Sequence, residues 1–128
     1  MARQTVEVAG VSAASPEAVW SVVSDFGGQW HPAIAAIHAE RDARGALVRA
    51  FTVHGEDTVY REQLTWLSES DRTLGYTCLE GIAGVDAYDA RIEVSSAQNS
   101  GGSILRWSAA VEADEPRLGD ICEGTKAI

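Results

Sequence analysis

Six segments of strand-like sequence, separated by short turn-rich stretches, dominate the middle of this chain. They occupy residues 36–41, 46–54, 58–68, 73–80, 86–97 and 103–113. They alternate in polarity or are rich in β-branched and aromatic residues, as strands are. The separators carry Gly, Asp, Asn and Ser and are too short for crossover connections, so consecutive strands should pair antiparallel. An antiparallel sheet is therefore the framework that this sequence predicts.

Helical segments are predicted on both sides of these strands. Residues 3–13 alternate in polarity and predict a further strand, after which Ser15 can cap a helix that has Pro16 in its first position. A second short helical piece is predicted from Trp30, and helical spacing returns after Pro116. The order strand, two short helices, six strands, helix favours an α+β fold with the helices on one face of the sheet.

Length and charge narrow the class of protein. The 128 residues fit one domain, 1–128, and the composition is that of a globular chain. The net charge is −9 and Lys126 is the only lysine, which argues against nucleic acid and anionic membranes as partners. No stretch resembles an export signal or the roughly 20 apolar residues of a spanning helix. We therefore expect a cytoplasmic protein.

No motif points to a metal or an organic cofactor. Cys78 and Cys122 match no zinc spacing and are too few for a disulfide scaffold, so we expect both to be reduced. His38 and His54 have no partner at metal-ligand spacing, and no metal site is predicted. The chain also has no phosphate-binding loop, dinucleotide fingerprint or serine-nucleophile motif, and no cofactor is expected.

A set of local motifs accompanies this order of elements. They are SPEAVW at 15–20, DFGG at 25–28, WHP at 30–32, GALVR at 45–49, EQL at 62–64, YT at 76–77, and GG at 101–102 before Trp107. Together they resemble the START/Bet v 1-like (SRPBCC) superfamily, in its bacterial polyketide cyclase/dehydrase-like branch, over nearly the whole chain. The resemblance implies a helix-grip fold, in which a seven-stranded antiparallel sheet curves around a C-terminal helix and two short helices follow the first strand. Because the sequence given ends at Ile128, that closing helix is expected to be short or truncated.

A sheet gripping a helix in this way can leave an internal cavity for a small, mostly apolar ligand. Alternation along the strands predicts which side chains face inward. The candidates for binding a ligand are mainly aromatic, and their alternative role is simply to fill the core. They are Phe51, Tyr60, Trp66, Tyr76, Tyr88 and Trp107 on strands, with Trp30 in the connection after the first helix.

Arg49 and Glu62 are charged residues that fall on these otherwise apolar faces. Burying an unpaired charge costs much free energy, whereas a paired and hydrogen-bonded charge is tolerated. We therefore predict that the two side chains pair inside the cavity. The pair could bind and orient a ligand carbonyl, with Glu62 as a proton carrier, or it could be a purely structural ion pair. The third alternative is that alternation fails here and both side chains lie in solvent.

His31 follows Trp30 in the bent connection near the expected mouth of the cavity. Histidine titrates near neutrality, so His31 is a candidate general acid or base beside Glu62. The alternative is a capping or packing role, which is common for a histidine next to a proline.

Three functions are compatible with these features. The first is binding of a small hydrophobic or aromatic molecule, such as a polyketide-like compound or a lipid. The second is a cyclase or dehydratase type of enzyme that moves protons with Glu62, His31 or a tyrosine. The third is a protein-interaction module, which would require a filled interior and a large exposed apolar patch. A homodimer is one way to cover sheet surface that a short closing helix would expose.

Overall fold

The computed structural model describes residues 2–81, 85–97 and 101–113. Within them it contains seven strands and one helix. In chain order the elements are β1 (Ala2–Ser12), α1 (Pro16–Val23), β2 (Ile34–Arg41), β3 (Leu47–Val53), β4 (Tyr60–Ser68), β5 (Thr73–Glu80), β6 (Val85–Ser96) and β7 (Ser103–Ala113). All seven predicted strands are present, and the bounds of β5 and β7 are those predicted.

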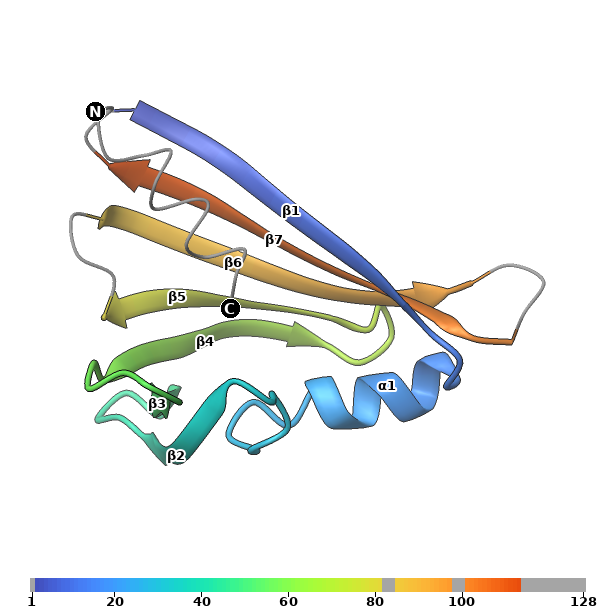
Figure 1. Cartoon of the computed structure of the whole chain (residues 1–128), viewed down its shortest axis with the longest axis horizontal. Coiled ribbons are helices and arrows are strands. Elements are labelled where there is room, and N and C mark those ends of the chain that lie inside the picture. The colour runs from blue at the N-terminus through green and yellow to red at the C-terminus, as the bar shows by residue number, and fades with distance from the viewer. Residues whose placement is uncertain (1, 82–84, 98–100, 114–128) are drawn as a thin grey trace.

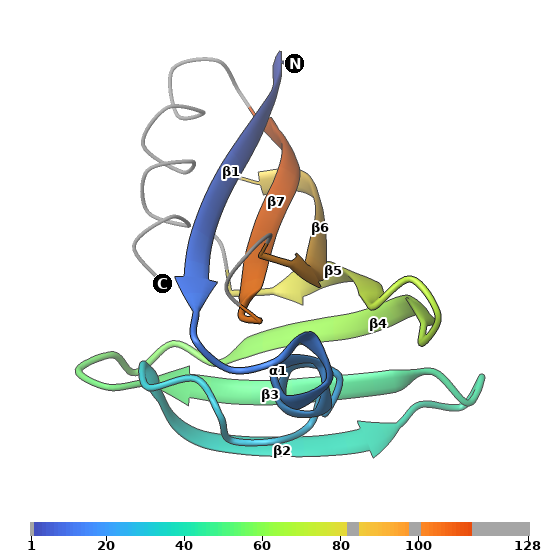
Figure 2. The ribbon, with the colours of Figure 1, turned by 90° about the vertical axis from the view of Figure 1, so that its right-hand side faces the viewer.

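The strands form one antiparallel sheet in the order β1-β7-β6-β5-β4-β3-β2 (Figure 1). Neighbours in this order are neighbours in sequence, except that β1 lies beside β7 and so brings the start of the chain next to its last described strand. The sheet is strongly curved, because β2 and β3 run across the direction of β1 and β7 (Figure 2). The curvature creates a concave side that faces the interior.

Helix α1 packs at one end of the curved sheet, where Figure 2 shows it end-on. The hydroxyl of Ser15 accepts a hydrogen bond from the Ala18 N–H at 3.2 Å, as predicted for the N-cap, and Pro16 opens the first turn. Trp20 and Val23 are buried against the core. The indole Nε1 of Trp20 also donates to Glu69 Oε2 at 2.6 Å, which ties the helix to the turn between β4 and β5.

The second short helix predicted from Trp30 is wrong. Residues 30–33 form a turn, and β2 begins directly after it at Ile34. Side chains satisfy the local backbone in place of a helical ladder: His31 Nδ1 accepts from the Ala33 N–H at 3.1 Å, and the Gln29 amide donates to the Ile34 carbonyl at 3.3 Å. The helix predicted after Pro116 lies outside the described residues.

A bulge in β4 changes the orientation of its second half. Leu64 lies opposite Tyr76 and Trp66 lies opposite Gly75, so Thr65 is an extra residue in the ladder. Leu64 packs against the core, whereas Trp66 turns outward and is 45% exposed. The inward orientation predicted for Trp66 is therefore wrong, because strict alternation cannot anticipate an inserted residue.

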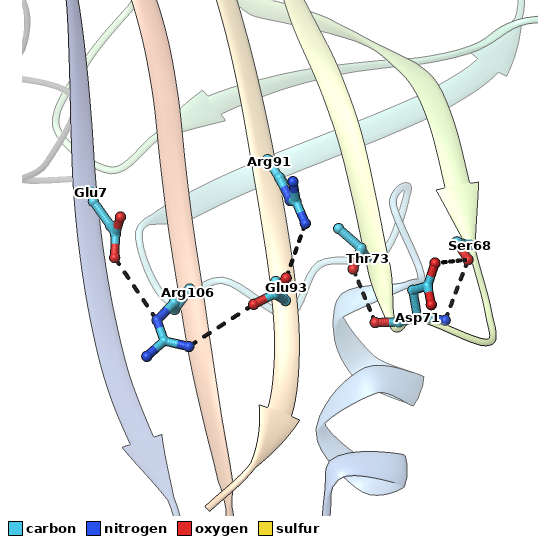
Figure 3. A network of polar contacts seen from close by, with 7 residues as sticks. All are labelled: Glu7, Ser68, Asp71, Thr73, Arg91, Glu93 and Arg106. Atoms are coloured by element: carbon cyan, nitrogen blue, oxygen red, sulfur yellow. Dashed lines mark hydrogen bonds and ion pairs between the residues drawn. The ribbon is translucent and has the colours of Figure 1, made fainter.

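The convex face of the sheet carries a chain of charged side chains across three strands (Figure 3). On β7, Arg106 Nε lies 3.9 Å from Oε1 of Glu7 on β1, and Arg106 Nη1 lies 4.0 Å from Oε1 of Glu93 on β6. Glu93 also accepts a hydrogen bond from Arg91 at 3.0 Å. The flanking residues of these strands point the other way, so polar and apolar faces are separated as the sequence alternation predicts.

The buried apolar residues form two clusters on the concave side. The larger cluster joins α1 to β1, β5, β6 and β7, and Leu74 and Val111 are completely buried in it. The smaller cluster consists of Ile34, Phe51 and Val53 from β2 and β3, with Tyr60 packed against it. A cavity lies between the two clusters and takes its walls from both.

Candidate functional site

The cavity has a volume of about 250 Å³. Its wall is mostly aliphatic and aromatic, with few polar groups. The lining residues are Val8, Trp30, His31, Ile34, Arg49, Phe51, Tyr60, Glu62, Tyr76, Tyr88, Ile92, Leu105 and Trp107. A mainly apolar concave surface with a few convergent polar groups is the usual character of a small-molecule site.

Arg49 and Glu62 form a buried ion pair in this wall, as predicted. The two residues are directly opposite each other on β3 and β4. Arg49 Nε donates to Glu62 Oε1 at 2.9 Å, and Arg49 Nη2 lies 2.7 Å from the same oxygen. Both side chains are about nine-tenths buried, with exposed fractions of 8% and 10%. The third alternative, in which both charges lie in solvent, is excluded.

The Arg49 guanidinium is also held by the segment between α1 and β2. Its Nη1 donates to the Phe26 carbonyl at 3.1 Å, and its central carbon lies 4.1 Å from the centre of the Phe26 ring. The rings of Tyr76 and Phe51 lie 5.1 and 5.5 Å from the same carbon. These distances are those of cation–π contacts, which stabilise a cation that has lost its water.

Burial raises the pKa of Glu62 above its ordinary value, and the attraction and hydrogen bond of Arg49 only partly oppose this effect. The carboxyl group is therefore more ready to hold a proton than an exposed glutamate. A carboxyl of this kind can accept a hydrogen bond when ionised and donate one when protonated.

Tyr76 lies beside this pair and is itself held in place. The indole Nε1 of Trp107 on β7 donates to the Tyr76 hydroxyl at 2.9 Å. Burial and the nearby charge of Glu62 raise the pKa of Tyr76, so its phenol stays neutral. Two of the predicted aromatic residues thus form one hydrogen-bonded unit across the sheet.

Tyr60 and Phe51 form a stacked pair on the side of the smaller cluster, with ring centres 5.3 Å apart. The Tyr60 hydroxyl donates to Glu56 Oε1 at 2.8 Å in the loop between β3 and β4. Burial and the Glu56 carboxylate raise the pKa of Tyr60. This tyrosine therefore presents its ring to the cavity and directs its hydroxyl to a carboxylate outside it.

Trp30 and His31 close another side of the cavity from the turn before β2. Trp30 Nε1 donates to the Asp25 carbonyl at 3.2 Å, and the rings of Trp30 and His31 lie 5.9 Å apart. Because His31 Nδ1 accepts from the Ala33 N–H, the proton of the neutral ring lies on Nε2. His31 thus has the packing role and also lies at the cavity.

The structure brings together nine of the ten residues predicted for the site, and Trp66 is the one that does not line the cavity. The aliphatic cavity residues Val8, Ile34, Ile92 and Leu105 were not among the predicted ligand-binding residues, although alternation along their strands placed Ile92 and Leu105 on the inward face. Alternation along β1, β6 and β7 was a usable signal for three of them. Phe26 was also missed as an Arg49 partner, because its place in a glycine-rich connection gives no periodic signal.

The described ranges contain neither a candidate metal site nor a helix that could span a membrane. No group of three His, Cys, Asp or Glu side chains there could hold a metal ion. No helix of that part of the chain is long and apolar enough to cross a membrane. Cys78 is partly buried at the edge of the larger cluster, and Cys122 lies beyond the residues that the structure describes.

Several solved structures share this fold at low sequence identity. The XoxI protein of Bacillus cereus has a TM-score of 0.80 at 22% identity, covering 100% of this chain and 87% of its own. The Zhui aromatase/cyclase of a Streptomyces strain has a TM-score of 0.73 at 19% identity. This match covers 88% of this chain and 70% of the cyclase chain. Norcoclaurine synthase of Thalictrum flavum has a TM-score of 0.71 at 19% identity, covering 90% and 72%. At such low identity these similarities show a shared fold.

The family comparison is more specific. The model of the family described as polyketide cyclase/dehydrase and lipid transport matches residues 3–127. No curated protein matches the chain. The matched span contains the helix, the whole cavity wall and every strand residue of the described ranges except Ala2. This chain therefore belongs to the polyketide cyclase/dehydrase and lipid transport family, as its sequence motifs predicted.

Proposed function

We propose that this protein binds a small, mainly apolar molecule, polyketide- or lipid-like, in the cavity between its two core clusters. The observation that carries the proposal is a buried Arg49–Glu62 pair set in an otherwise aromatic and aliphatic wall. Polar groups are costly to bury, and a few of them in an apolar pocket serve to orient a ligand. An engineered cavity of about 150 Å³ admits benzene, so the volume of about 250 Å³ suits a molecule of one or two rings.

Naphthalene is a suitable neutral probe for this proposal, and nuclear magnetic resonance can locate it. Titration should shift the backbone signals of cavity residues such as Tyr88 and Ile92, which are buried on β6. Leu105→Trp should fill the cavity and abolish these shifts, because Leu105 lines it. Val11→Trp is the matched control, since Val11 is 80% exposed and outside the cavity.

Two outcomes would contradict the proposal. One is a set of shifts confined to the convex face of the sheet. The other is naphthalene binding that Leu105→Trp leaves unchanged while circular dichroism shows a folded variant. Either result would mean that the cavity is not the binding site.

A cyclase or dehydratase activity is the second candidate, favoured by the raised pKa of Glu62 at the cavity wall. In such a reaction Glu62 would take a proton from a carbon next to a ketone, and that carbon would attack a second ketone of the same molecule to give an alkoxide that is then protonated to an alcohol. Loss of a second proton from the attacking carbon, together with the alcohol oxygen as hydroxide that takes up a proton, would release one water and leave a C=C bond. His31 and Tyr76 are at the same cavity and could return the proton. Mass spectrometry of a linear triketone incubated with the protein would detect the loss of one water.

Glu62→Gln separates the two candidates. If wild-type protein turns the triketone over and Glu62→Gln binds it without turnover, the enzyme is favoured. If wild-type protein binds without turnover, the binding function stands alone. The interaction module is disfavoured, because it requires a filled interior and the interior holds a cavity.

A further inference from the structure

We propose that the cavity selects uncharged molecules that carry a hydroxyl group, and that Glu62, rather than Arg49, is the polar residue that meets the ligand. This inference rests on the proposed function, because it specifies the class of ligand for the same cavity. The polar atoms around the cavity differ in whether the protein itself already supplies their partners.

Arg49 is largely occupied by the protein itself. All three guanidinium nitrogens lie close to a protein oxygen. Nε donates to Glu62 Oε1, Nη1 donates to the Phe26 carbonyl, and Nη2 lies 2.7 Å from Glu62 Oε1 as an ion pair. The Phe26 ring lies over the guanidinium, with its centre 4.1 Å from the central carbon. The positive charge is thus paired and shielded, and Arg49 acts as a positioning residue that fixes the Glu62 carboxyl.

One of the two carboxyl oxygens of Glu62 has no contact with Arg49. Both contacts from Arg49 end on Oε1, and Oε2 receives no hydrogen bond from any residue within the described ranges. In the same part of the chain no fully buried side-chain oxygen is without a partner, so Oε2 is not sealed in the core. Since Glu62 lines the cavity, Oε2 is the atom that a bound molecule would meet.

Tyr76 supplies a complementary group close by. Glu62 lies opposite Cys78 in the ladder between β4 and β5, which makes Tyr76 its diagonal neighbour on the same face. The Tyr76 oxygen accepts from Trp107, so its own O–H proton is left to donate, and no described residue accepts it. The cavity therefore offers a phenol donor beside a carboxyl group.

These groups match a hydroxyl better than a carboxylate. A ligand carboxylate would place a second negative charge beside Glu62 in a nonpolar cavity, where like charges repel strongly. A hydroxyl both donates and accepts, so it can pair with Tyr76 and with Glu62 in either protonation state. Burial raises the pKa of Glu62, so a ligand group that suits both protonation states of this carboxyl is favoured.

Four ligands of one shape test the inference: 2-naphthol, 2-methoxynaphthalene, naphthalene and 2-naphthoate, titrated by calorimetry at neutral pH. We expect 2-naphthol to bind about tenfold more tightly than 2-methoxynaphthalene, which can accept but not donate. We expect 2-naphthoate to bind more weakly than naphthalene. If 2-naphthoate binds best, or if 2-naphthol has no advantage over the ether, the selectivity is wrong while the binding function survives. If none of the four binds, the proposed function fails and the inference with it.

Glu62→Gln provides a second readout, because it leaves the Arg49 charge without a counter-ion. Affinity for 2-naphthoate should rise at least tenfold relative to the affinity for naphthalene. Glu93→Gln removes a paired carboxylate on the convex face and is the matched control, with no change expected. If Glu62→Gln does not fold, Tyr76→Phe replaces it: this variant should lose the preference for 2-naphthol over naphthalene. An unchanged ligand order in both variants would overturn the inference.

Discussion

At the scale of single residues, the buried Arg49–Glu62 pair is the feature from which we expect the largest effects on stability and, under the proposed function, on binding. The guanidinium and the carboxyl group lie in a cavity wall that also contains aromatic rings, and both side chains are about nine-tenths buried. Removing one partner of such a pair leaves an uncompensated charge, whereas replacing both with apolar residues is often neutral. The pair is therefore expected to act as a unit in mutagenesis.

Arg49→Met should lower the free energy of unfolding by about 3–5 kcal/mol, because Glu62 is left buried and unpaired. The double variant Arg49→Met with Glu62→Met should recover most of this loss. Urea denaturation of both single variants and of the double variant measures the coupling energy. The exposed pair Arg91–Glu93 is the matched control and should give a several-fold smaller coupling. Additive effects at Arg49 and Glu62 would contradict this expectation.

The raised pKa of Glu62 predicts a pH dependence of stability with a definite sign. The folded protein holds the Glu62 proton to a higher pH than the unfolded chain, in which the ordinary value of 4.5 applies. This contribution is therefore complete below pH 4.5 and is lost as the pH rises through the folded pKa. The difference in unfolding free energy between wild type and Glu62→Gln should fall over this window. Denaturation from below pH 4.5 to neutrality measures it, and a rising difference would show that Arg49 lowers the pKa.

At the scale of elements, the bulge in β4 decides which tryptophan serves the cavity. Trp66 and Trp107 sit on inward-facing positions by simple alternation, yet Trp66 is 45% exposed and Trp107 lines the cavity. The extra residue Thr65 reverses the face after Leu64. Two residues of the same type in the same predicted role thus have different environments.

Trp107→Phe should weaken naphthalene binding several-fold, because it removes part of the wall and the hydrogen bond that holds Tyr76. Trp66→Phe should leave the affinity unchanged, since its ring lies on the other face of the sheet. Both affinities can be measured by the same magnetic resonance titration. Equal effects of the two substitutions would be inconsistent with the bulge.

The strands and the Arg49–Glu62 pairing were predictable from sequence because both depend on local, periodic signals. The alternation of β3 and β4 places the two charges on apolar faces, and an antiparallel pair of strands brings them opposite each other. The turn at 30–33 was not predictable, because it depends on two side-chain hydrogen bonds with the backbone: Gln29 donates to the Ile34 carbonyl, and His31 accepts from the Ala33 N–H. The Phe26 contact was hidden for a similar reason, since it forms between segments 23 residues apart.

At the scale of the whole molecule, the cavity exists because two core clusters do not meet. A ligand placed between them would contact both and would bind the folded chain but not the unfolded one. Binding should therefore couple to the stability of the entire sheet.

A bound ligand should stabilise the protein by mass action. At a free concentration of one hundred times its Kd, 2-naphthol should raise the free energy of unfolding by about 2.7 kcal/mol. Urea denaturation with and without 2-naphthol measures this increase, and Leu105→Trp should show none. An equal gain in Leu105→Trp would indicate binding outside the cavity.

The charged chain on the convex face has a consequence for how the strands find their alignment. Arg106 lies directly opposite Glu93 in the ladder between β7 and β6, and Glu7 is its diagonal neighbour on β1. A slip of any of these strands by one residue would turn its charged side chains into the cavity and its apolar side chains into water. A misaligned sheet would therefore lose stability on both of its faces. The charged convex face thus helps to hold the strands in the register that forms the cavity on the concave face.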